Sequence, residues 1–201
     1  MKLIDISRPL SPETAVFPGD VPFQREWSFR MERGDSCNVS WVKGSAHAGT
    51  HVDFPYHFEE QDRGAPALEP FIGPAFVVEV ADWERVREQK IPPRTRVLFK
   101  TRNSRTPHTV FDHEFDCIPS WIPGWLAERD ALLVGVDGPS VDPVDSKDLP
   151  NHKALLAAGI AILENLDLSH APPGPAELIA LPLKVEGADA SWVRAVLRYD
   201  D

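Results

Sequence analysis

The chain has 201 residues, of which 42% are hydrophobic and 26% are charged, a composition typical of a globular protein large enough to bury a sizeable core. Its 31 acidic side chains outnumber its 21 lysines and arginines, which gives a formal net charge of −10. A negative field of this kind repels polyanions, so nucleic acids and anionic membrane surfaces are not expected as partners.

Two further features bear on where the protein works. The amino-terminal segment MKLIDISRPL has no apolar run of the kind found in a secretory signal, and the longest nearly uncharged run, ALLAAGIAIL at 154–163, is too short to span a bilayer. Cys37 and Cys117 form no CxxC pair, which favours reduced thiols over a disulfide framework. We therefore expect a soluble protein of the cytoplasm.

The first two thirds of the chain predict strands separated by short helices. LIDIS at 3–7 alternates like a strand, a loop rich in proline follows at 11–20, and residues 22–43 are expected to form one or two further strands. Short helices are expected at 82–89 and 120–129. Before, between and after them lie apolar runs that predict buried strands, at 76–81, 96–100 and 131–137.

The last third continues this pattern. A helix at 152–158, ended by Gly159, is expected to lead into a strand at 160–166. A strand at 177–183 and a final strand or short helix complete the chain. There is no internal repeat or dividing linker, so the sequence predicts one α/β or α+β domain over residues 1–201, with a mixed β-sheet core flanked by helices.

The segment HAGTHVDFPYH at 47–57 holds three of the seven histidines of the chain. Its glycine and proline oppose a helix, so we expect a strand that runs into a loop. His47, His51, Asp53 and His57 are all odd-numbered, and an extended backbone would project the four side chains to one face. The segment is therefore a candidate for chemistry that needs converging polar groups.

Converging imidazoles and a carboxylate are the donors that Zn²⁺ takes, and a carboxylate also suits Mn²⁺. Single histidines usually pack or face solvent, but four such groups on one face are costly to bury without a cation. An open position on the metal would hold a water that ionises near neutral pH. His57 lies beyond the proline that turns the chain, so we expect it to carry protons rather than to bind the metal.

The same segment resembles the signature His-x-Gly-Thr-His-x-Asp-x-Pro-x-His of the cyclase family, to which the bacterial kynurenine formamidases (arylformamidases) belong. All seven specified positions match. The resemblance extends to DISRPLSPETAVFPGD at 5–20, to HKALLAAGIAILENLDL at 152–168 and to ELIALPLKVEGADASWVRAVL at 177–197, while the middle, roughly 82–130, matches weakly. It implies the swivelling β/α-like fold of cyclases.

The resemblance also implies a two-metal site. In the family, a histidine and a glutamate twelve positions later complete the site, and here these are His152 and Glu164. Two divalent ions per subunit are implied, with zinc favoured and manganese as the alternative, and His57 is the proton donor and acceptor. The implied ligands are His47, His51, Asp53 and Glu164 for one ion, and Asp53, His152 and Glu164 for the other.

The activity that the resemblance implies is hydrolysis of N-formyl-L-kynurenine to L-kynurenine and formate, a step of tryptophan degradation, by a homodimer or higher homo-oligomer. Two positions depart from the family pattern. Phe17 stands where the formamidases have a tryptophan that contacts the substrate, and Trp192 follows Ser191 where a proline is expected. Phe17 keeps an aromatic face for stacking but lacks the indole N–H donor.

Two alternatives remain open. The first is a related hydrolase of another amide, such as the cyclic amide of isatin, because the same metals and base would serve. The second is a structural or metal-sequestering protein, although structural zinc sites usually recruit thiolates and one tetrahedral ion has no need of His57. Outside this segment, His108 lies in a proline-containing polar loop and is expected at the surface.

Overall fold

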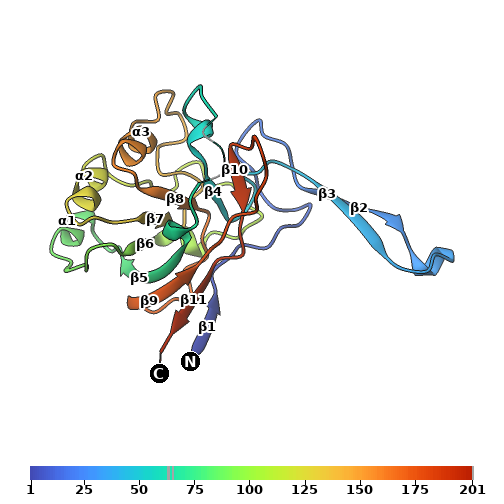
Figure 1. Cartoon of the computed structure of the whole chain (residues 1–201), viewed down its shortest axis with the longest axis horizontal. Coiled ribbons are helices and arrows are strands. Elements are labelled where there is room, and N and C mark those ends of the chain that lie inside the picture. The colour runs from blue at the N-terminus through green and yellow to red at the C-terminus, as the bar shows by residue number, and fades with distance from the viewer. Residues whose placement is uncertain (63, 65, 201) are drawn as a thin grey trace.

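The computed structural model describes residues 1–62, 64 and 66–200. Its strands are β1 (Lys2–Asp5), β2 (Gln24–Phe29), β3 (Val39–Lys43), β4 (His51–Asp53), β5 (Ile72–Glu79), β6 (Arg96–Lys100), β7 (Leu133–Val136), β8 (Ala161–Glu164), β9 (Gly174–Ile179), β10 (Ala190–Trp192) and β11 (Val196–Tyr199). Its α-helices are α1 (Trp83–Val86), α2 (Ile122–Ala127) and α3 (Pro150–Ala157). Nine strands form one mixed sheet in the order β1-β11-β9-β5-β6-β7-β8-β4-β10, and β2 pairs with β3 in a separate hairpin (Figure 1).

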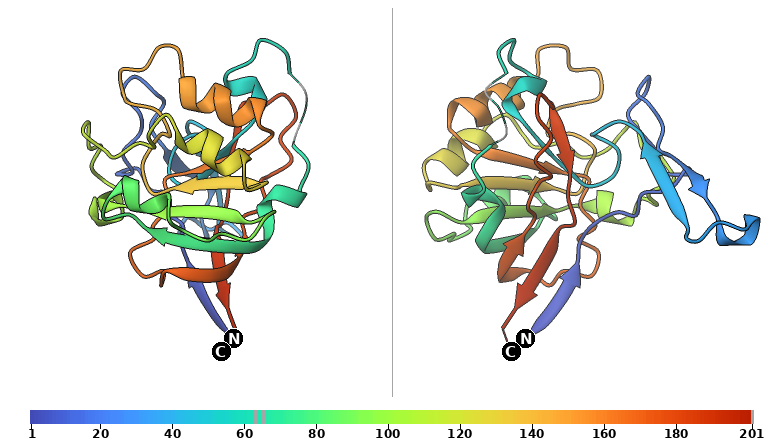
Figure 2. Two further views of the ribbon diagram at one scale, coloured as in Figure 1. Left: turned by 90° about the vertical axis from the view of Figure 1, so that its left-hand side faces the viewer. Right: turned by 45° about the vertical axis from the view of Figure 1, so that its right-hand side comes forward.

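The four central strands β5, β6, β7 and β8 are parallel, and each connection between them passes through one of the helices. Successive crossovers of one hand place their helices on the same face of a sheet, and Figure 2 shows the three helices gathered on one side. Apolar side chains of α2 and α3, such as Leu126 and Leu155, pack there against Phe99 and Val134 of the strands. Among the described residues, none of the helices has the length and apolar character needed to cross a bilayer.

The opposite face of the sheet is covered by the sheet itself. The antiparallel strands β9, β11 and β1 curl over it, so that Leu178, Leu197 and Ile4 join Val77 and Leu98 in a second core cluster. The prediction of a mixed sheet in an α+β domain is confirmed, but in the part of the chain that the structure describes helices flank only one of its faces. The reason is that the antiparallel strands have no crossovers that could carry further helices.

Several predicted boundaries shift. The strand expected at 177–183 ends at Ile179, because Pro182 has no N–H to donate to a neighbouring strand. The helix expected at 82–89 is reduced to α1, and that expected at 120–129 is reduced to α2, which has Pro123 in its first turn. The final segment forms the strands β10 and β11 rather than a short helix.

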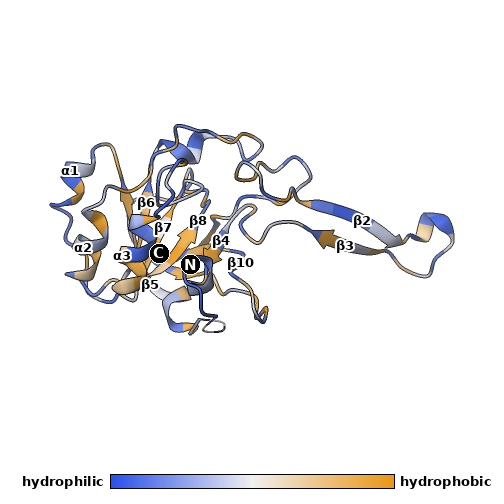
Figure 3. Ribbon diagram, turned by 90° about the horizontal axis from the view of Figure 1, so that it is seen from above, coloured by the Kyte–Doolittle hydropathy of each residue, from blue (hydrophilic) through white to orange (hydrophobic). Residues whose placement is uncertain are grey.

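The hairpin of β2 and β3, which we call the arm, extends away from the body of the molecule (Figures 1 and 3). It confirms the prediction of strands within 22–43. The arm has no packed face of its own, a situation in which a two-stranded hairpin is marginally stable. Its exposed apolar side chains, 40–61% accessible, are Phe29, Met31, Val39, Trp41 and Val42.

Candidate metal centre

The histidine-rich segment does not form one continuous strand. Only β4, His51–Asp53, is extended, whereas His47 lies in the preceding turn and His57 ends a 3-10 helix. The prediction that an extended backbone places all four side chains on one face is therefore wrong for His47 and His57. The turns nevertheless bring them together, with ring centroids 4.2 Å apart, and the ring of His51 lies 4.8 Å from that of His47.

The glycine and the threonine of the segment build the turn before β4. Gly49 has φ +65°, and a Cβ at this position would stand 2.8 Å from Cδ2 of Leu10, so only glycine fits without strain. The Thr50 hydroxyl accepts the N–H of Arg8 at 2.8 Å and donates to the carbonyl of Asn165 at 2.6 Å. These bonds hold the start of β4 against the end of β8.

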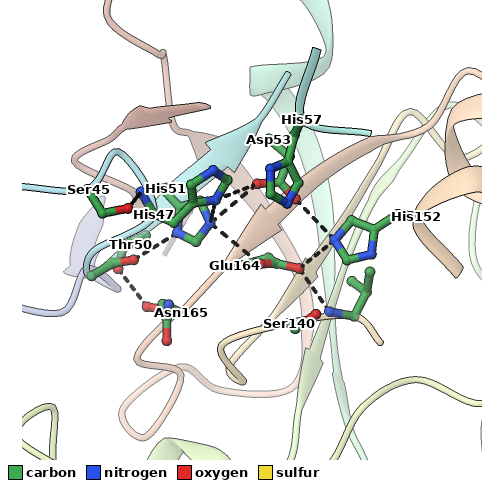
Figure 4. Close-up of polar contacts among 12 residues, drawn as sticks. Ser45, His47, Thr50, His51, Asp53, His57, Ser140, His152, Glu164 and Asn165 are labelled. Atoms are coloured by element: carbon green, nitrogen blue, oxygen red, sulfur yellow. Dashed lines mark hydrogen bonds and ion pairs between the residues drawn. The ribbon is translucent and has the colours of Figure 1, made fainter. Parts of the chain in front are cut away.

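The register of the sheet places Glu164, which is distant in sequence, beside the histidine-rich segment. His51 is the direct partner of Glu164 in the antiparallel pair of β4 and β8, and direct partners project to the same face. His51 Nε2 consequently lies 3.4 Å from Glu164 Oε2. His152 enters from the first turn of α3, with Nε2 3.4 Å from Asp53 Oδ2 and 3.5 Å from Glu164 Oε1 (Figure 4). The five predicted ligands therefore lie in one cluster.

Three imidazoles of the cluster are fixed by hydrogen bonds on the nitrogen that faces away from it. Such an outer acceptor sets the tautomer and leaves the inner nitrogen free as a donor to a cation, an arrangement found for metal-binding histidines. The pairs are His51 Nδ1 with the Gly49 carbonyl at 2.9 Å, His152 Nδ1 with Asp142 Oδ2 at 2.7 Å, and His47 Nε2 with Asp189 Oδ2 at 3.1 Å.

Asp53 shows that the cluster fits metal ions. Both of its carboxylate oxygens are buried, and neither has a hydrogen-bond partner among the described residues. Its Oδ1 lies 3.3 Å from His47 Nδ1 and 3.3 Å from His51 Nε2, which are 3.1 Å from each other. Ligand atoms bound tetrahedrally to zinc are separated by about 3.3 Å. His152 Nε2 lies on the other side, 3.4 Å from Asp53 Oδ2, so the cluster offers a group of donors that could hold a metal ion.

The electrostatics agree with this fit. Burial disfavours the charged form of Asp53, but contacts with His152, His47 and His51 hold its pKa well below the usual value. Burial lowers the pKa of His51, yet Asp53 and Glu164 outweigh it and raise that pKa to about 10. In the same way, burial lowers the pKa of His152, and its carboxylate partners raise it to about 12. Without a cation, protons on the imidazoles balance the two buried carboxylates.

His57 lies at the edge of this cluster, where one of its ring nitrogens comes within 4.8 Å of ligand atoms of Asp53 and His152. Its side chain is 30% exposed, and its ring centroid lies 5.9 Å from that of His152. Burial lowers the pKa of His57, so its ring is neutral at neutral pH and can accept a proton. The residue expected to carry protons is therefore a neutral imidazole, and its role stays a prediction.

A cavity of about 450 Å³ opens over the cluster, and its lining includes His57 and the aromatic rings of Phe17, Phe111 and Phe115. Phe17 and Phe111 meet edge to face, with centroids 5.3 Å apart and an interplanar angle of 77°. His108 also lines the cavity, so the expectation that it is an ordinary surface residue is wrong. The weakly matching middle of the chain thus supplies one wall of this cavity.

The sequence did not predict a role for two carboxylates near the cluster, those of Asp142 and Asp189. Asp142 accepts the backbone N–H groups of Asn151 at 3.0 Å and His152 at 3.1 Å, so it caps α3 as well as fixing an imidazole. A lone aspartate among prolines resembles a turn residue. One signal could have revealed it: Leu149 stands at the N-cap of α3 and has no side chain able to cap a helix, so a distant acceptor was required.

Comparisons with known proteins agree with this geometry. Residues 4–143 match the family model described as "Putative cyclase". The chain is 47% identical over 208 residues to the kynurenine formamidase of Salinibacter ruber, and the alignment covers 98% of each chain. It is also similar to a protein described as a predicted metal-dependent hydrolase from Bacillus stearothermophilus, with a TM-score of 0.83, 26% identity and coverage of 98% of this chain and 97% of that chain. Isatin hydrolase A from Labrenzia aggregata has the same fold, with a TM-score of 0.81, 23% identity and coverage of 98% and 93%.

Proposed function

Because the chain belongs to the cyclase family, we propose that it is a metal-dependent amide hydrolase that cleaves N-formyl-L-kynurenine to L-kynurenine and formate. The observation that carries the proposal is Asp53, whose two oxygens accept no hydrogen bond from the described residues and lie between the imidazoles of His47 and His51 on one side and His152 on the other. The 47% identical relative named kynurenine formamidase supports the choice of substrate. Residues 1–201 act as one domain in this reaction.

The proposed cofactors are two divalent ions, with zinc as the native metal. His47, His51, Asp53 and Glu164 would hold the first ion, and Asp53, His152 and Glu164 the second. When bound, ions of this kind polarise a carbonyl oxygen and lower the pKa of water. The carboxylates of Asp53 and Glu164 each have one oxygen near His51 and the other near His152, which supports this assignment. Manganese suits the same donors, so elemental analysis of the purified protein identifies the metal.

His57 is the proposed proton carrier. Its neutral ring accepts a proton from the attacking water and returns it to the departing aniline nitrogen, while the oxygen of that water joins the formyl carbon. The carbon–nitrogen bond then breaks, and L-kynurenine and formate leave. Proton transfer by a positioned imidazole contributes about 10²–10⁴ to a rate. Phe17 and Phe111 are proposed to pack against the aromatic ring of the substrate.

We also propose that the protein is a homodimer or higher homo-oligomer in the cytoplasm. The arm supports self-association, because apolar side chains such as Phe29 and Trp41 are 51% and 40% exposed there. Cys37 and Cys117 are both free thiols, which suits a reducing compartment.

The experiment that tests the activity compares turnover of N-formyl-L-kynurenine and of isatin by the zinc-loaded protein. We expect turnover of the formyl amide; hydrolysis of isatin alone would favour the other family activity. His57→Ala is expected to keep the bound metal and to lose about 10²–10⁴ in kcat. His170→Ala, which changes an exposed histidine outside the cavity lining, is the matched control and is expected to retain full activity. Undiminished turnover by His57→Ala would remove the role proposed for His57.

A further inference from the structure

Asp189 lies at the point where the chain enters β10, beside the strand that carries the metal-binding segment. Its carbonyl accepts the backbone N–H of Phe54 at 2.9 Å, and the next residue, Ala190, is the ladder partner of Asp53. The backbone of Asp189 is therefore fixed against the end of β4, a few residues before His57. This placement does not depend on the Asp189 side chain.

The Asp189 side chain contacts two histidines with one oxygen. Oδ2 lies 3.1 Å from His47 Nε2 and 3.8 Å from His57 Nδ1. The two imidazole rings face each other with centroids 4.2 Å apart and an interplanar angle of 40°. Asp189 Oδ2 is therefore a carboxylate oxygen beside the Nδ1 side of the neutral His57 ring. One carboxylate thus lies at the outer edge of both a metal-ligand candidate and the proposed proton carrier.

We propose that Asp189 is a positioning residue that fixes His47 and His57 relative to each other. By accepting the Nε2–H of His47, it keeps Nδ1 of that ring facing Asp53. Its Oδ2 lies 3.8 Å from Nδ1 of His57, within reach of a long polar contact, and an acceptor on that side leaves Nε2 of the ring available to the substrate. The part of the inference that concerns His57 rests on the proposed function, because the orientation of His57 matters only if this residue takes part in catalysis.

Because Asp189 is exposed, its side chain is expected to contribute little to folding stability, which distinguishes a positioning role from a purely structural one. Its side chain is 50% exposed, and ion pairs in contact with water contribute little to folding stability. The backbone hydrogen bond to Phe54 and the ladder between β10 and β4 remain when the side chain changes. Substitution of Asp189 is therefore expected to alter metal binding and turnover while leaving the melting temperature nearly unchanged.

The test uses Asp189→Asn, which has nearly the same shape, in the full-length zinc-loaded protein. The first readout is the chelator concentration that removes half of the bound zinc, and it is expected to fall about tenfold because outer-shell partners of ligating histidines typically contribute 10–100-fold. The second is kcat for N-formyl-L-kynurenine, expected to fall about 10–100-fold with KM within twofold of the wild-type value. Asp189→Glu keeps the charge and is expected to recover part of both losses.

A double-mutant cycle tests the link to His57. If Asp189 acts on turnover through His57, the variant His57→Ala/Asp189→Asn is expected to be no slower than His57→Ala alone. Asp5→Asn is the matched control, because Asp5 forms a similarly exposed ion pair with Arg194 at 2.6 Å, away from the cluster; this variant is expected to match the wild type in both readouts.

The proposal requires that Asp189→Asn lowers both chelator resistance and kcat, and that its effect on kcat depends on His57. Wild-type chelator resistance in Asp189→Asn would overturn it, as would an equal loss of kcat in the presence and absence of His57. If the wild-type protein does not hydrolyse the formyl amide, the proposed function fails, and the chelator measurement still decides whether Asp189 fixes His47.

Discussion

His51 and Glu164 occupy the same rung of the antiparallel ladder between β4 and β8, although they come from distant parts of the chain. Their side chains project to the same face of the sheet, so a nitrogen and an oxygen donor meet at 3.4 Å without any contribution from a flexible loop. The second oxygen of Glu164 accepts the N–H of Val141 at 2.8 Å, which orients the carboxylate. The sheet therefore supplies a rigid platform for the candidate metal centre.

Glu164→Gln tests this platform. The glutamine oxygen can still accept the N–H of Val141, so the local fold is expected to persist, but a neutral amide cannot bridge two cations as a carboxylate does. We expect bound zinc to fall well below the wild-type content. Activity is expected to fall by more than the 10–100-fold that outer-shell changes cost. Glu177→Gln, in an ion pair with Arg198 elsewhere on the sheet, is the control for removing one carboxylate charge; an equal loss of zinc in both variants would contradict the assignment.

Asp142→Asn is expected to affect both the fold and the metal. Asp142 is fully buried and accepts two backbone N–H groups at the start of α3 together with the imidazole of His152. An asparagine must place an amide N–H against at least one of these donors, so the free energy of unfolding is expected to fall by about 1–3 kcal/mol. Zinc affinity is expected to fall 10–100-fold.

The control for Asp142→Asn is Asp148→Asn. Asp148 is an exposed carboxylate near the start of the same helix, so this variant reports any general effect of charge at the helix terminus. Denaturant unfolding and chelator competition on both variants check the prediction. Equal behaviour of the two variants would show that the helix dipole, rather than the specific contacts of Asp142, accounts for the effect.

The sequence predicted that side chains of residues 47–57 meet at the candidate metal centre. It did not predict which backbone features bring them together. The alternation of odd-numbered residues suggested one strand face, yet the strand is only three residues long, and turns built by Gly49 and Pro55 bring His47 and His57 into place. Local periodicity describes regular backbone, so it cannot show how two turns will aim a side chain. The types of residue in the segment were the more reliable indication of chemistry.

Long-range partners were beyond any local pattern. His152 and Glu164 were assigned through family resemblance, and their position depends on β4 pairing with β8, which no short window of sequence encodes. Asp142 and Asp189 were overlooked because a single aspartate near glycine or proline is usually explained by turn formation. The central strands were predicted well, because continuous apolar runs between turns are typical of buried parallel strands.

Metal binding is expected to depend steeply on pH. In the absence of a cation, the pKa of His51 is about 10 and that of His152 is about 12, so both rings carry protons at neutral pH that a metal ion must displace. Raising the pH makes this displacement easier, and zinc affinity should increase between pH 6 and pH 8 by about tenfold per pH unit for each proton released. Calorimetric titration in buffers of different ionisation enthalpy counts the protons; pH-independent affinity would contradict the prediction.

The cavity wall at Phe17 predicts an effect on substrate binding. Phe17→Ala removes a ring that meets Phe111 edge to face, and aromatic contacts of this kind are worth about 0.5–1.5 kcal/mol beyond the area they bury. We therefore expect KM for N-formyl-L-kynurenine to rise up to about tenfold, with bound zinc unchanged. Phe17→Leu keeps an apolar side chain without the ring, so steady-state kinetics of the two variants separate stacking from bulk. A wild-type KM in both variants would place the substrate elsewhere in the cavity.

The arm predicts that self-association depends on its apolar side chains. The triple variant Phe29→Ser, Trp41→Ser and Val42→Ser removes side chains that are 51%, 40% and 51% exposed, so little packing within the chain is lost. We expect light scattering to show a dimer or larger assembly for the wild type and a monomer for the variant, because burial of such side chains is the main gain in association. The double variant Arg30→Gln and Glu32→Gln removes an exposed ion pair of the arm and is expected to remain assembled, since such pairs contribute little. A monomeric wild type, or a triple variant of unchanged mass, would show that the arm has another role.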